Sequence, residues 1–351
     1  MHQHFENIKL EAIGSVVPNN AVSNDFFSEL LSAKERSFFE KTVGIKNRYW
    51  ADKNVTASDL GVEAFKVLED NLTGFDKNCV DAIIFLSQTP DYLIPFTSNI
   101  LQNKLGLRKD ILCIDINAGC AGFIQGLSTA YSLASTLKEG KKVLLIIAET
   151  LSKIISIKDR TTSMLFGDGA SAMLISKTDI SNPTDFNFFS DGENFDSIII
   201  PDGGYRNMTC PKSLEEYTTS EGVTKTRVNL EMNGKKVFDF TLREVAPSIN
   251  QLIDSSSIER ESIDNYLFHQ SNLFIIKQIT NLLEIDKLKV LTNIEEFGNT
   301  SSVSIPLLIT GNSEKLSLNG KSLMAGYGSG LNWGNCYTDL SLTKIFKTKY
   351  V

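Results

Sequence analysis

The chain has 351 residues, 42% of them hydrophobic and 22% charged, which is enough for two domains or one duplicated domain in a globular enzyme. A formal net charge of −7 argues against nucleic acid or an anionic membrane surface as the main partner, because no long Lys/Arg run offsets it locally. The five cysteines are odd in number and form no Cys-x-x-Cys pair, which favours a reducing cytoplasm over a disulfide framework or a metal site.

The N-terminal residues, Met-His-Gln-His-Phe-Glu-Asn, show no basic segment followed by an apolar core. The longest apolar stretches reach only about eight residues, against the ~20 of a membrane-spanning helix. We therefore expect no signal peptide, no membrane span and a cytoplasmic location.

Strand-like apolar runs alternate with segments of helical period, which predicts an α/β fold with largely parallel pairing. In chain order, the first half predicts a helix over residues 59–71 and strands at 80–87, 111–116, 143–148 and 171–176.

A second helix is predicted to follow Cys120, with Gly122, Gly126, Ala130 and Ala134 at four-residue intervals. This stripe of small residues allows close backbone packing, so we expect the helix in the middle of the fold. Gly140 is predicted as its C-cap.

The second half of the chain repeats the first in outline. Residues 263–270 echo residues 80–88, each an Asp-containing apolar strand that ends in polar residues, so we expect a duplicated domain with halves 1–178 and 179–351. Residues 202–233 have no sustained period and predict a long loop or flap, which we expect to cover the substrate entrance.

Three residues of chemical interest each follow an apolar run. Cys120 lies where a predicted strand gives way to a helix, His269 follows residues 263–268, and Asn299 lies in Phe-Gly-Asn-Thr-Ser-Ser (297–302). The start of a helix favours thiolate over thiol, and open α/β sheets bind their ligands at strand ends. Together the three residues predict an active site in which His269 supplies the imidazole.

At this level of detail the chain resembles the β-ketoacyl-acyl carrier protein synthase III group of the thiolase-like superfamily, over nearly its full length. The resemblance lies in six segments in the same order: Thr-Val-Gly-Ile-Lys-Asn-Arg (42–48), Asn-Ala-Gly-Cys-Ala-Gly-Phe (117–123), Asp-Arg-Thr-Thr-Ser-Met-Leu-Phe-Gly-Asp-Gly-Ala (159–170), Phe-His-Gln-Ser-Asn (268–272), Phe-Gly-Asn-Thr-Ser-Ser (297–302) and Gly-Tyr-Gly-Ser-Gly-Leu-Asn-Trp-Gly (326–334). It implies a thiolase-like α/β fold in which duplicated βαβαβαββ halves form α/β/α/β/α layers.

The resemblance also implies a mechanism. Cys120 would take an acyl group from a thioester, and His269 and Asn299 would hold a malonyl thioester whose decarboxylation yields the attacking carbanion. The backbone N–H groups of Cys120 and Ser329 would form the oxyanion hole. Coenzyme A or phosphopantetheine thioesters would be substrates, without a separate cofactor or metal, and acyl carrier protein would be a possible partner.

Several positions depart from the family pattern. Phe38 and Thr42 stand where an aromatic residue and an arginine usually stack on the adenine of coenzyme A, although Arg160 matches the phosphate-binding arginine. We count Asn272, which belongs to the His269 motif, and Phe274 among the substrate-binding residues. Phe274 replaces a basic residue that helps dock acyl carrier protein, so the chain is expected to be a specialised member with weaker steering of an acidic carrier.

Residues 90–96 resemble the segment that a partner subunit inserts as the floor of the acyl pocket, with Ile94 at the gate, which implies a homodimer.

Two alternative functions stay open. One is a specialised acyltransferase that acts on an O, N or other C nucleophile, and a more remote one is a non-catalytic acyl-binding subunit. A papain-like hydrolase lacks its Cys-Gly-Ser-Cys-Trp signature here, a degradative thiolase would need a second catalytic cysteine, and a hydroxymethylglutaryl-type synthase would need a carboxylate base.

Overall fold

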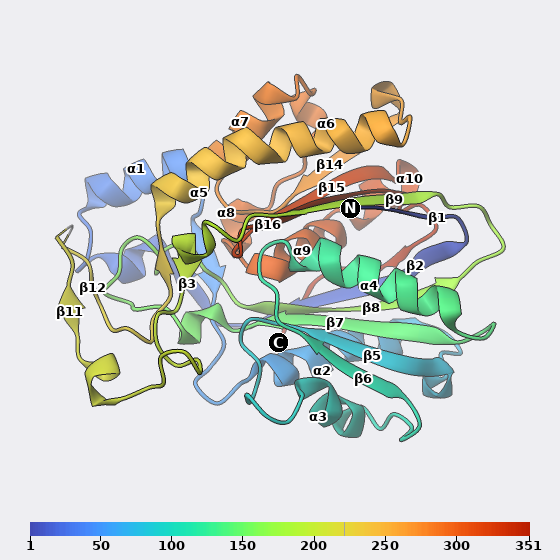
Figure 1. Cartoon of the computed structure of the whole chain (residues 1–351), viewed down its shortest axis with the longest axis horizontal. Helices are drawn as coiled ribbons and strands as arrows, with labels where there is room; N and C mark the ends of the chain where they lie inside the picture. The colour runs from blue at the N-terminus through green and yellow to red at the C-terminus, as the bar shows by residue number, and fades with distance from the viewer. Residues whose placement is uncertain (221) are drawn as a thin grey trace.

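Two β-sheets, one mainly from each half of the chain, form the framework of the molecule (Figure 1). In this computed structural model, which describes residues 1–220 and 222–351, the seven-stranded sheet has the order β17-β2-β8-β7-β5-β6, with β18 also paired to β2, and the five-stranded sheet has the order β1-β9-β16-β15-β14. The first sheet consists of β2 (Ile8–Val17), β5 (Val80–Leu86), β6 (Leu112–Ile116), β7 (Lys142–Glu149), β8 (Gly169–Lys177), β17 (Lys344–Ile345) and β18 (Lys349–Tyr350). The second consists of β1 (His2–Phe5), β9 (Thr184–Ser190), β14 (Asn265–Phe268), β15 (Lys321–Gly328) and β16 (Asn332–Asp339).

The two sheets repeat one pattern of pairing. In the first, β2 pairs antiparallel with β8, β8 antiparallel with β7, and β7 parallel with β5. In the second, β9, β16, β15 and β14 follow in the same order with the same directions. The first sheet continues with β6, which pairs parallel to β5. At the equivalent position of the second sheet, next to β14, there is an isolated parallel bridge between Tyr266 and Val290. The order therefore reflects the expected duplication.

The prediction of largely parallel pairing holds for the first sheet, in which β8 runs against the other strands. It does not hold for the second sheet, in which β14 and β15 pair parallel and the other neighbours pair antiparallel. The strands predicted in the first half are confirmed to within a few residues. The division at residue 178 stays a prediction. Strands near the two chain ends do not follow this division, since β1 joins the sheet of the second half and β17 and β18 join the sheet of the first half.

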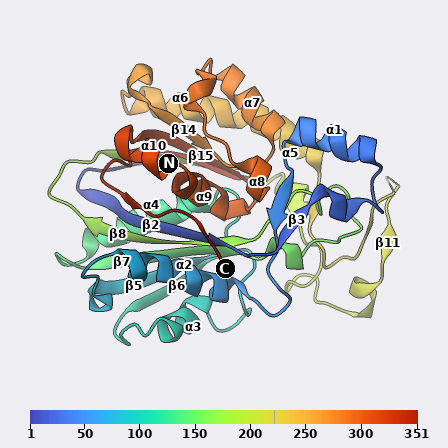
Figure 2. The same ribbon diagram turned by 180° about the vertical axis from the view of Figure 1, so that it is seen from behind.

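Helices form three layers around the sheets (Figures 1 and 2). The outer face of the first sheet is covered by α2 (Ala57–Asn71) and α3 (Thr97–Lys104), and that of the second by α6 (Ala246–Ser255) and α7 (Leu273–Leu282). Between the sheets lie α4 (Gly122–Thr136) and α9 (Ser304–Gly311), and each of these contacts strands of both sheets. This is the predicted α/β/α/β/α arrangement.

The small residues of α4 are explained by its central position. A Cβ atom on Gly122 or Gly126 would lie 2.7 or 2.8 Å from the Leu86 side chain, so α4 packs against β5 as closely as glycine permits. The predicted C-cap is wrong, because α4 ends at Thr136 and the next residue, Leu137, is extended. Gly140, with φ of +77°, instead lies in the turn before β7.

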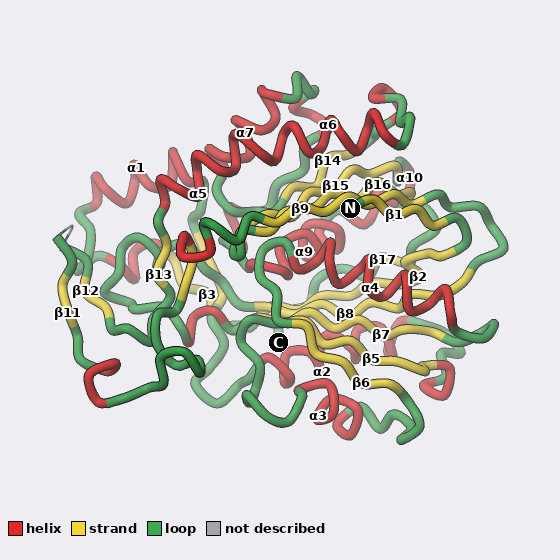
Figure 3. Tube along the Cα trace, in the orientation of Figure 1, coloured by secondary structure: helices red, strands yellow, loops and turns green. Residues whose placement is uncertain are grey.

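The remaining elements lie at the edges of the two halves. They are α1 (Ala33–Val43), α5 (Gly234–Phe240), α8 (Ile294–Phe297), α10 (Ser313–Leu318), β3 (Ala21–Ser23), β4 (Asn47–Tyr49), β10 (Ile198–Ile199), β11 (Tyr217–Thr218), β12 (Thr224–Lys225) and β13 (Glu231–Met232). Residues 202–233 are mostly irregular, as predicted, with β11 and β12 as a short hairpin (Figure 3), and residue 221 lies outside the described residues. Within the described part of the chain, no helix has the length and apolarity needed to cross a bilayer.

Candidate active site

Cys120, His269 and Asn299 line one cavity of ≈260 Å³, together with Ser329. Cys120 lies between the end of β6 and the start of α4, His269 directly follows β14, and Asn299 follows α8. Side chains such as Leu151, Phe166, Ile198, Leu230 and Met232 form an apolar wall of the same cavity. The predicted flap thus contributes its last residues to the cavity wall.

The Cys120 thiol is half-buried, with Sγ 3.7 Å from the Ser301 hydroxyl. Burial raises its pKa to about 11, and the charge of Glu149 acts in the same direction, whereas Ser301 and the backbone groups of Cys120 and Ser329 lower it. Burial therefore favours the thiol over the expected thiolate in the resting site. Desolvation is the largest contribution to this shift, and α4 begins only at Gly122, two residues after the thiol.

The glycine-rich C-terminal turn packs directly against the nucleophile. A Cβ atom on Gly328 would lie 2.5 Å from Cys120 Cβ and 2.9 Å from Cys120 Sγ. Because real side chains do not approach so closely, only glycine at this position lets Ser329 lie beside Cys120. This close approach explains one glycine of the motif at residues 326–334.

His269 is buried, and its Nδ1 lies 2.7 Å from the hydroxyl of Ser304, the first residue of α9. The Ser304 hydroxyl oxygen also accepts a bond from the Gln270 N–H at 3.3 Å. Tyr327 holds the other side of the residue, because its hydroxyl donates to the His269 carbonyl at 3.1 Å and its ring meets the imidazole edge to face. Burial lowers the His269 pKa to about 3, so the imidazole is neutral at physiological pH.

Asn299 is held by backbone bonds to a segment of the first half. Its N–H donates to the Leu165 carbonyl at 2.8 Å, and its carbonyl accepts from the Gly167 N–H at 3.0 Å. A Cβ atom on Gly298, where φ is +67°, would lie 2.8 Å from the same Leu165 oxygen, which explains the glycine before Asn299. The side-chain oxygen of Asn299 accepts from the Ser301 N–H at 2.9 Å, so the amide nitrogen is the atom that can donate to a ligand.

Beneath the cavity lies Glu149, a fully buried carboxyl at the end of β7. Its Oε1 accepts from Ser302 Oγ at 2.8 Å, and its Oε2 accepts from the Gln88 N–H at 3.1 Å and from Thr89 Oγ1 at 3.2 Å. Burial raises its pKa to about 8, and these hydrogen bonds oppose the shift. Glu149 thereby ties the turn after β5 to the loop that carries Asn299.

The predicted substrate-binding residues fall into two groups. Asn272 lines the cavity and caps α7, because its Oδ1 accepts from the Phe274 N–H at 2.7 Å. Phe274 is half-exposed and stacks on Phe238, a cavity residue, with ring centroids 5.7 Å apart. Ile94 instead lies in an exposed loop.

Phe38, Thr42 and Arg160 lie away from the nucleophile, on or near α1. Phe38 is exposed, and the Thr42 hydroxyl donates to the Phe38 carbonyl at 2.8 Å within the helix. Hydrogen bonds from Ser32 and, more weakly, the charge of Arg160 lower the pKa of Glu35 in the first turn of α1. Arg160 and Phe38 therefore lie on the same side of the molecule.

Four residues that contact this site were not identified from the sequence: Gln88, Glu149, Ser301 and Ser304. The signal for Gln88 was present, since it ends the run whose echo ends in Gln270. Glu149 also had a signal, since it is a carboxylate at the end of the apolar run 143–148, whereas Ser301 and Ser304 lie in a Ser-rich stretch without a distinguishing pattern. The described residues include no group of three or more His, Cys, Asp or Glu placed to hold a metal ion.

A cysteine between strand and helix in one half of a duplicated five-layer fold, with a neutral histidine and an asparagine from the other half, defines a condensing enzyme of the thiolase-like class. Residues 114–192 match the family model of 3-oxoacyl-[acyl-carrier-protein] synthase III, and residues 253–339 match the model of its C-terminal part.

Relatives and solved structures agree with these matches. The chain is 34% identical over 338 residues to beta-ketoacyl-[acyl-carrier-protein] synthase III of Lactococcus lactis subsp. cremoris, covering 95% of this chain and 99% of that protein. It is 36% identical over 334 residues to the enzyme of the same name from Clostridium perfringens, covering 94% and 98%. The crystal structure of 3-oxoacyl-(acyl-carrier protein) synthase from Burkholderia xenovorans superposes with a TM-score of 0.92 at 32% identity, covering 100% of this chain and 99% of that one.

The chain therefore belongs to the 3-oxoacyl-[acyl-carrier-protein] synthase III family. The predicted family, thiolase-like fold and enzyme class, an acyltransferase of the ketoacyl synthase type, are confirmed.

Proposed function

We propose that this enzyme joins an acyl thioester to a malonyl thioester by decarboxylating condensation, through an acyl intermediate on Cys120. The observation that carries the proposal is the convergence of Cys120, His269, Asn299 and Ser329 on one cavity. In the first half-reaction the Cys120 sulfur forms a bond to the acyl carbonyl carbon. The bond to the donor sulfur breaks, and coenzyme A or a carrier thiol leaves with the proton.

In the second half-reaction the malonyl thioester loses carbon dioxide. The electron pair of the broken C–C bond forms an enolate, whose carbon attacks the carbonyl of the Cys120 thioester. Cys120 then leaves, takes up a proton and is ready for the next cycle, and the product is a β-ketoacyl thioester.

His269 and Asn299 are proposed to stabilise the enolate as neutral hydrogen-bond donors. The low pKa of His269 keeps its imidazole uncharged, and a Ser304 hydroxyl that donates to Nδ1 would leave the imidazole proton on Nε2. The Asn299 amide nitrogen is the second donor, since its oxygen is engaged by the Ser301 N–H. Two preorganised donors suit an oxyanion that exists only during the reaction.

The oxyanion hole for the Cys120 thioester is assigned to the backbone N–H groups of Cys120 and Ser329. Support comes from the thiol itself, because the backbone groups of these two residues both lower its pKa. Donors that stabilise negative charge on sulfur lie where they can also stabilise an oxyanion formed next to that sulfur. Losing one such donor typically lowers the rate about 10²–10³-fold.

We assign recognition of coenzyme A mainly to Arg160, which would bind a phosphate group. The contacts to the adenine ring would contribute less to binding. Phe38 is 68% exposed and free to stack on a base, but Thr42 provides no cationic partner for that stack. Phe274, at the stacked pair with Phe238, offers no charge to an acidic carrier. We therefore expect a carrier-bound malonyl group to bind without strong electrostatic steering. We also propose that the enzyme is cytoplasmic.

A homodimer is also part of this proposal. Tyr92, Leu93, Ile94 and Phe96 form a run of large exposed apolar side chains, which suits burial by a second copy rather than contact with water. Strand β6 is an edge of its sheet, with Leu112 exposed, and could pair with the same strand of the partner. Sedimentation at several concentrations, with Leu93→Asp as the disrupting variant, tests this point.

Intact-mass measurement after incubation with acyl-coenzyme A thioesters tests the mechanism. The wild type should gain the acyl mass, and Cys120→Ala should gain none while it keeps its fold, since alanine is close in size to cysteine. His269→Ala and Asn299→Ala should still be acylated but should fail to release carbon dioxide from malonyl thioester. Acylation of Cys120→Ala would refute the nucleophile assignment. Loss of acylation with retained decarboxylation in the other two variants would reverse the division of roles.

A further inference from the structure

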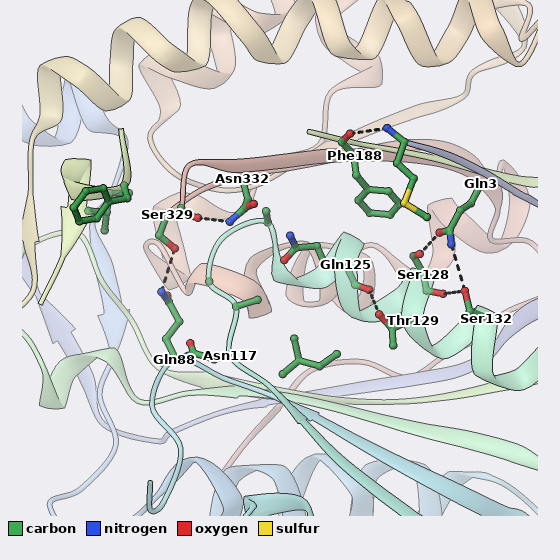
Figure 4. Close-up of a pocket in the computed structure, with 18 residues that line it drawn as sticks. Gln3, Gln88, Asn117, Gln125, Ser128, Thr129, Ser132, Phe188, Ser329 and Asn332 are labelled. Atoms are coloured by element: carbon green, nitrogen blue, oxygen red, sulfur yellow. Dashed lines mark hydrogen bonds between the residues drawn. The ribbon is translucent and has the colours of Figure 1, made fainter. Parts of the chain in front are cut away.

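Gln88, in the turn after β5, lies between two cavities. The catalytic cavity and a larger groove of ≈780 Å³ share three lining residues, Gln88, Ile198 and Ser329. Figure 4 shows the groove, with Gln88 and Ser329 joined by a hydrogen bond on one side and polar side chains of α4 on another. Gln88 therefore has one face toward Cys120 and one toward the groove.

The Gln88 side chain is fixed at both ends of its amide. Nε2 donates to Ser329 Oγ at 3.2 Å, and Oε1 accepts from Ser301 Oγ at 3.3 Å. A Cβ atom on Gly119 would lie 2.3 Å from Oε1, so the amide packs directly against the residue before the nucleophile. The backbone is fixed as well, because the Gln88 N–H donates to buried Glu149. A side chain held at so many points has a defined position in the cavity wall.

The spaces on the two sides of Gln88 differ in chemistry. The catalytic cavity has an apolar wall that suits a hydrocarbon chain. The groove has a mixed lining: polar side chains from α4, including Gln125 and Ser128, line it together with apolar ones such as Ile116, Phe188 and Phe195. An acyl chain that extended past Gln88 would leave a mainly apolar wall and enter a wider space of mixed lining.

We propose that the Gln88 side chain is a partition that limits which acyl groups reach Cys120, in addition to the expected gate at Ile94, because it closes the catalytic cavity on the side of the groove. The inference rests on the proposed acylation of Cys120. The substrates of the wild type are then acyl chains that fit the apolar cavity alone. A shorter side chain at residue 88 joins the two spaces, so longer chains, and chains with a hydroxyl or amide at the far end, gain room.

Acylation rates of purified full-length protein decide the matter, measured by intact mass with straight-chain acyl-coenzyme A thioesters of increasing length and one chain with a terminal hydroxyl. Gln88→Ala should raise the ratio of long-chain to short-chain rates by about tenfold or more, the range expected when a pocket gains room for further methylenes. Gln88→Thr, a smaller change, should shift the ratio in the same direction and replaces Gln88→Ala if that variant unfolds.

Two variants distinguish the effect of side-chain volume at residue 88 from the effects of its hydrogen bonds and of changes in the groove. Gln88→Leu keeps the volume without the amide bonds and should keep the wild-type ratio, as should Gln125→Ala, which alters only the groove. An unchanged ratio in Gln88→Ala, an equal loss at every chain length, or Gln88→Leu behaving like Gln88→Ala would overturn the partition. Failure of the wild type to acquire any acyl mass on Cys120 would instead refute the proposed function.

Discussion

Replacing Glu149 by glutamine should make the stability of the protein less sensitive to rising pH. The Glu149 carboxyl is fully buried and accepts hydrogen bonds from Ser302, Thr89 and the Gln88 N–H. A glutamine of the same shape can satisfy these partners, because its oxygen can accept from Gln88 and Thr89 and its NH₂ can donate to a Ser302 hydroxyl that has rotated. The substitution thus removes a titrating group without leaving a buried polar atom unpaired.

The size of the effect follows from proton linkage. Burial raises the Glu149 pKa from 4.5 to about 8, so between these values the folded protein holds a proton that the unfolded chain has released. Because the folded state binds more protons, the free energy of unfolding falls as pH rises through this window, by ~1.4 kcal/mol per pH unit. Between about pH 6 and pH 8 the wild type should lose ~2 kcal/mol that Glu149→Gln does not lose, because the slope falls off as pH approaches the folded pKa. Burial also raises the Asp168 pKa, to about 6, but Asp168 is the same in both proteins.

Urea unfolding, followed by circular dichroism at one protein concentration and at several pH values in this window, measures the difference. Stability of Glu149→Gln minus that of the wild type should increase with pH and become constant above about pH 8. Glu29→Gln, which removes an exposed carboxylate, is the matched control and should run parallel to the wild type. Parallel curves for Glu149→Gln as well would show that Glu149 is not held protonated by burial.

Other predictions concern the reaction. Gly328→Ala should lower the acylation rate more than about 100-fold, as expected when an oxyanion donor is displaced, because its Cβ would collide with Cys120; intact-mass kinetics would show a near-normal rate if the turn can shift. Glu149→Gln should also lower the apparent pKa of Cys120 in iodoacetamide labelling, since the charge of Glu149 raises it, and an unchanged profile would contradict this. Arg160→Ala should raise the KM for acyl-coenzyme A about tenfold or more but leave an acyl-pantetheine substrate unaffected, whereas equal loss on both would assign Arg160 to the fold or the dimer. Medium or longer chains should load faster than acetyl, and Ile94→Phe should shift the preference toward short chains; acetyl as the fastest primer of the wild type would refute the gate.

The fold and the three central residues were predictable because their signals are local. Strand and helix periods are read over a few residues, and the glycines around Cys120 and Asn299 mark close backbone approaches that lie within short motifs. The strand directions were not predictable in the same way. Alternating strands and helices favour parallel pairing, but the antiparallel return of β8 and β16 depends on long-range topology.

The supporting contacts could not be predicted, because they join residues far apart in the chain. Ser301 meets Gln88 across 213 residues, and Gln88 meets Ser329 across 241. The prediction of a thiolate at Cys120 failed for a related reason. A helix start is visible in the sequence, whereas the extent of burial that raises the thiol pKa depends on what both halves place around it.

The electrostatics of the cavity determine when charge can form in it. Burial raises the Cys120 pKa to about 11 and lowers the His269 pKa to about 3, so in the empty site each group favours its neutral form. Burial therefore favours a neutral thiol beside a neutral imidazole in the resting enzyme. An incoming thioester changes this balance, because its carbonyl oxygen receives the negative charge beside the backbone N–H groups of Cys120 and Ser329. Loss of the thiol proton and attack on the substrate are then coupled, and the neutral thiol resists alkylation and oxidation between turnovers.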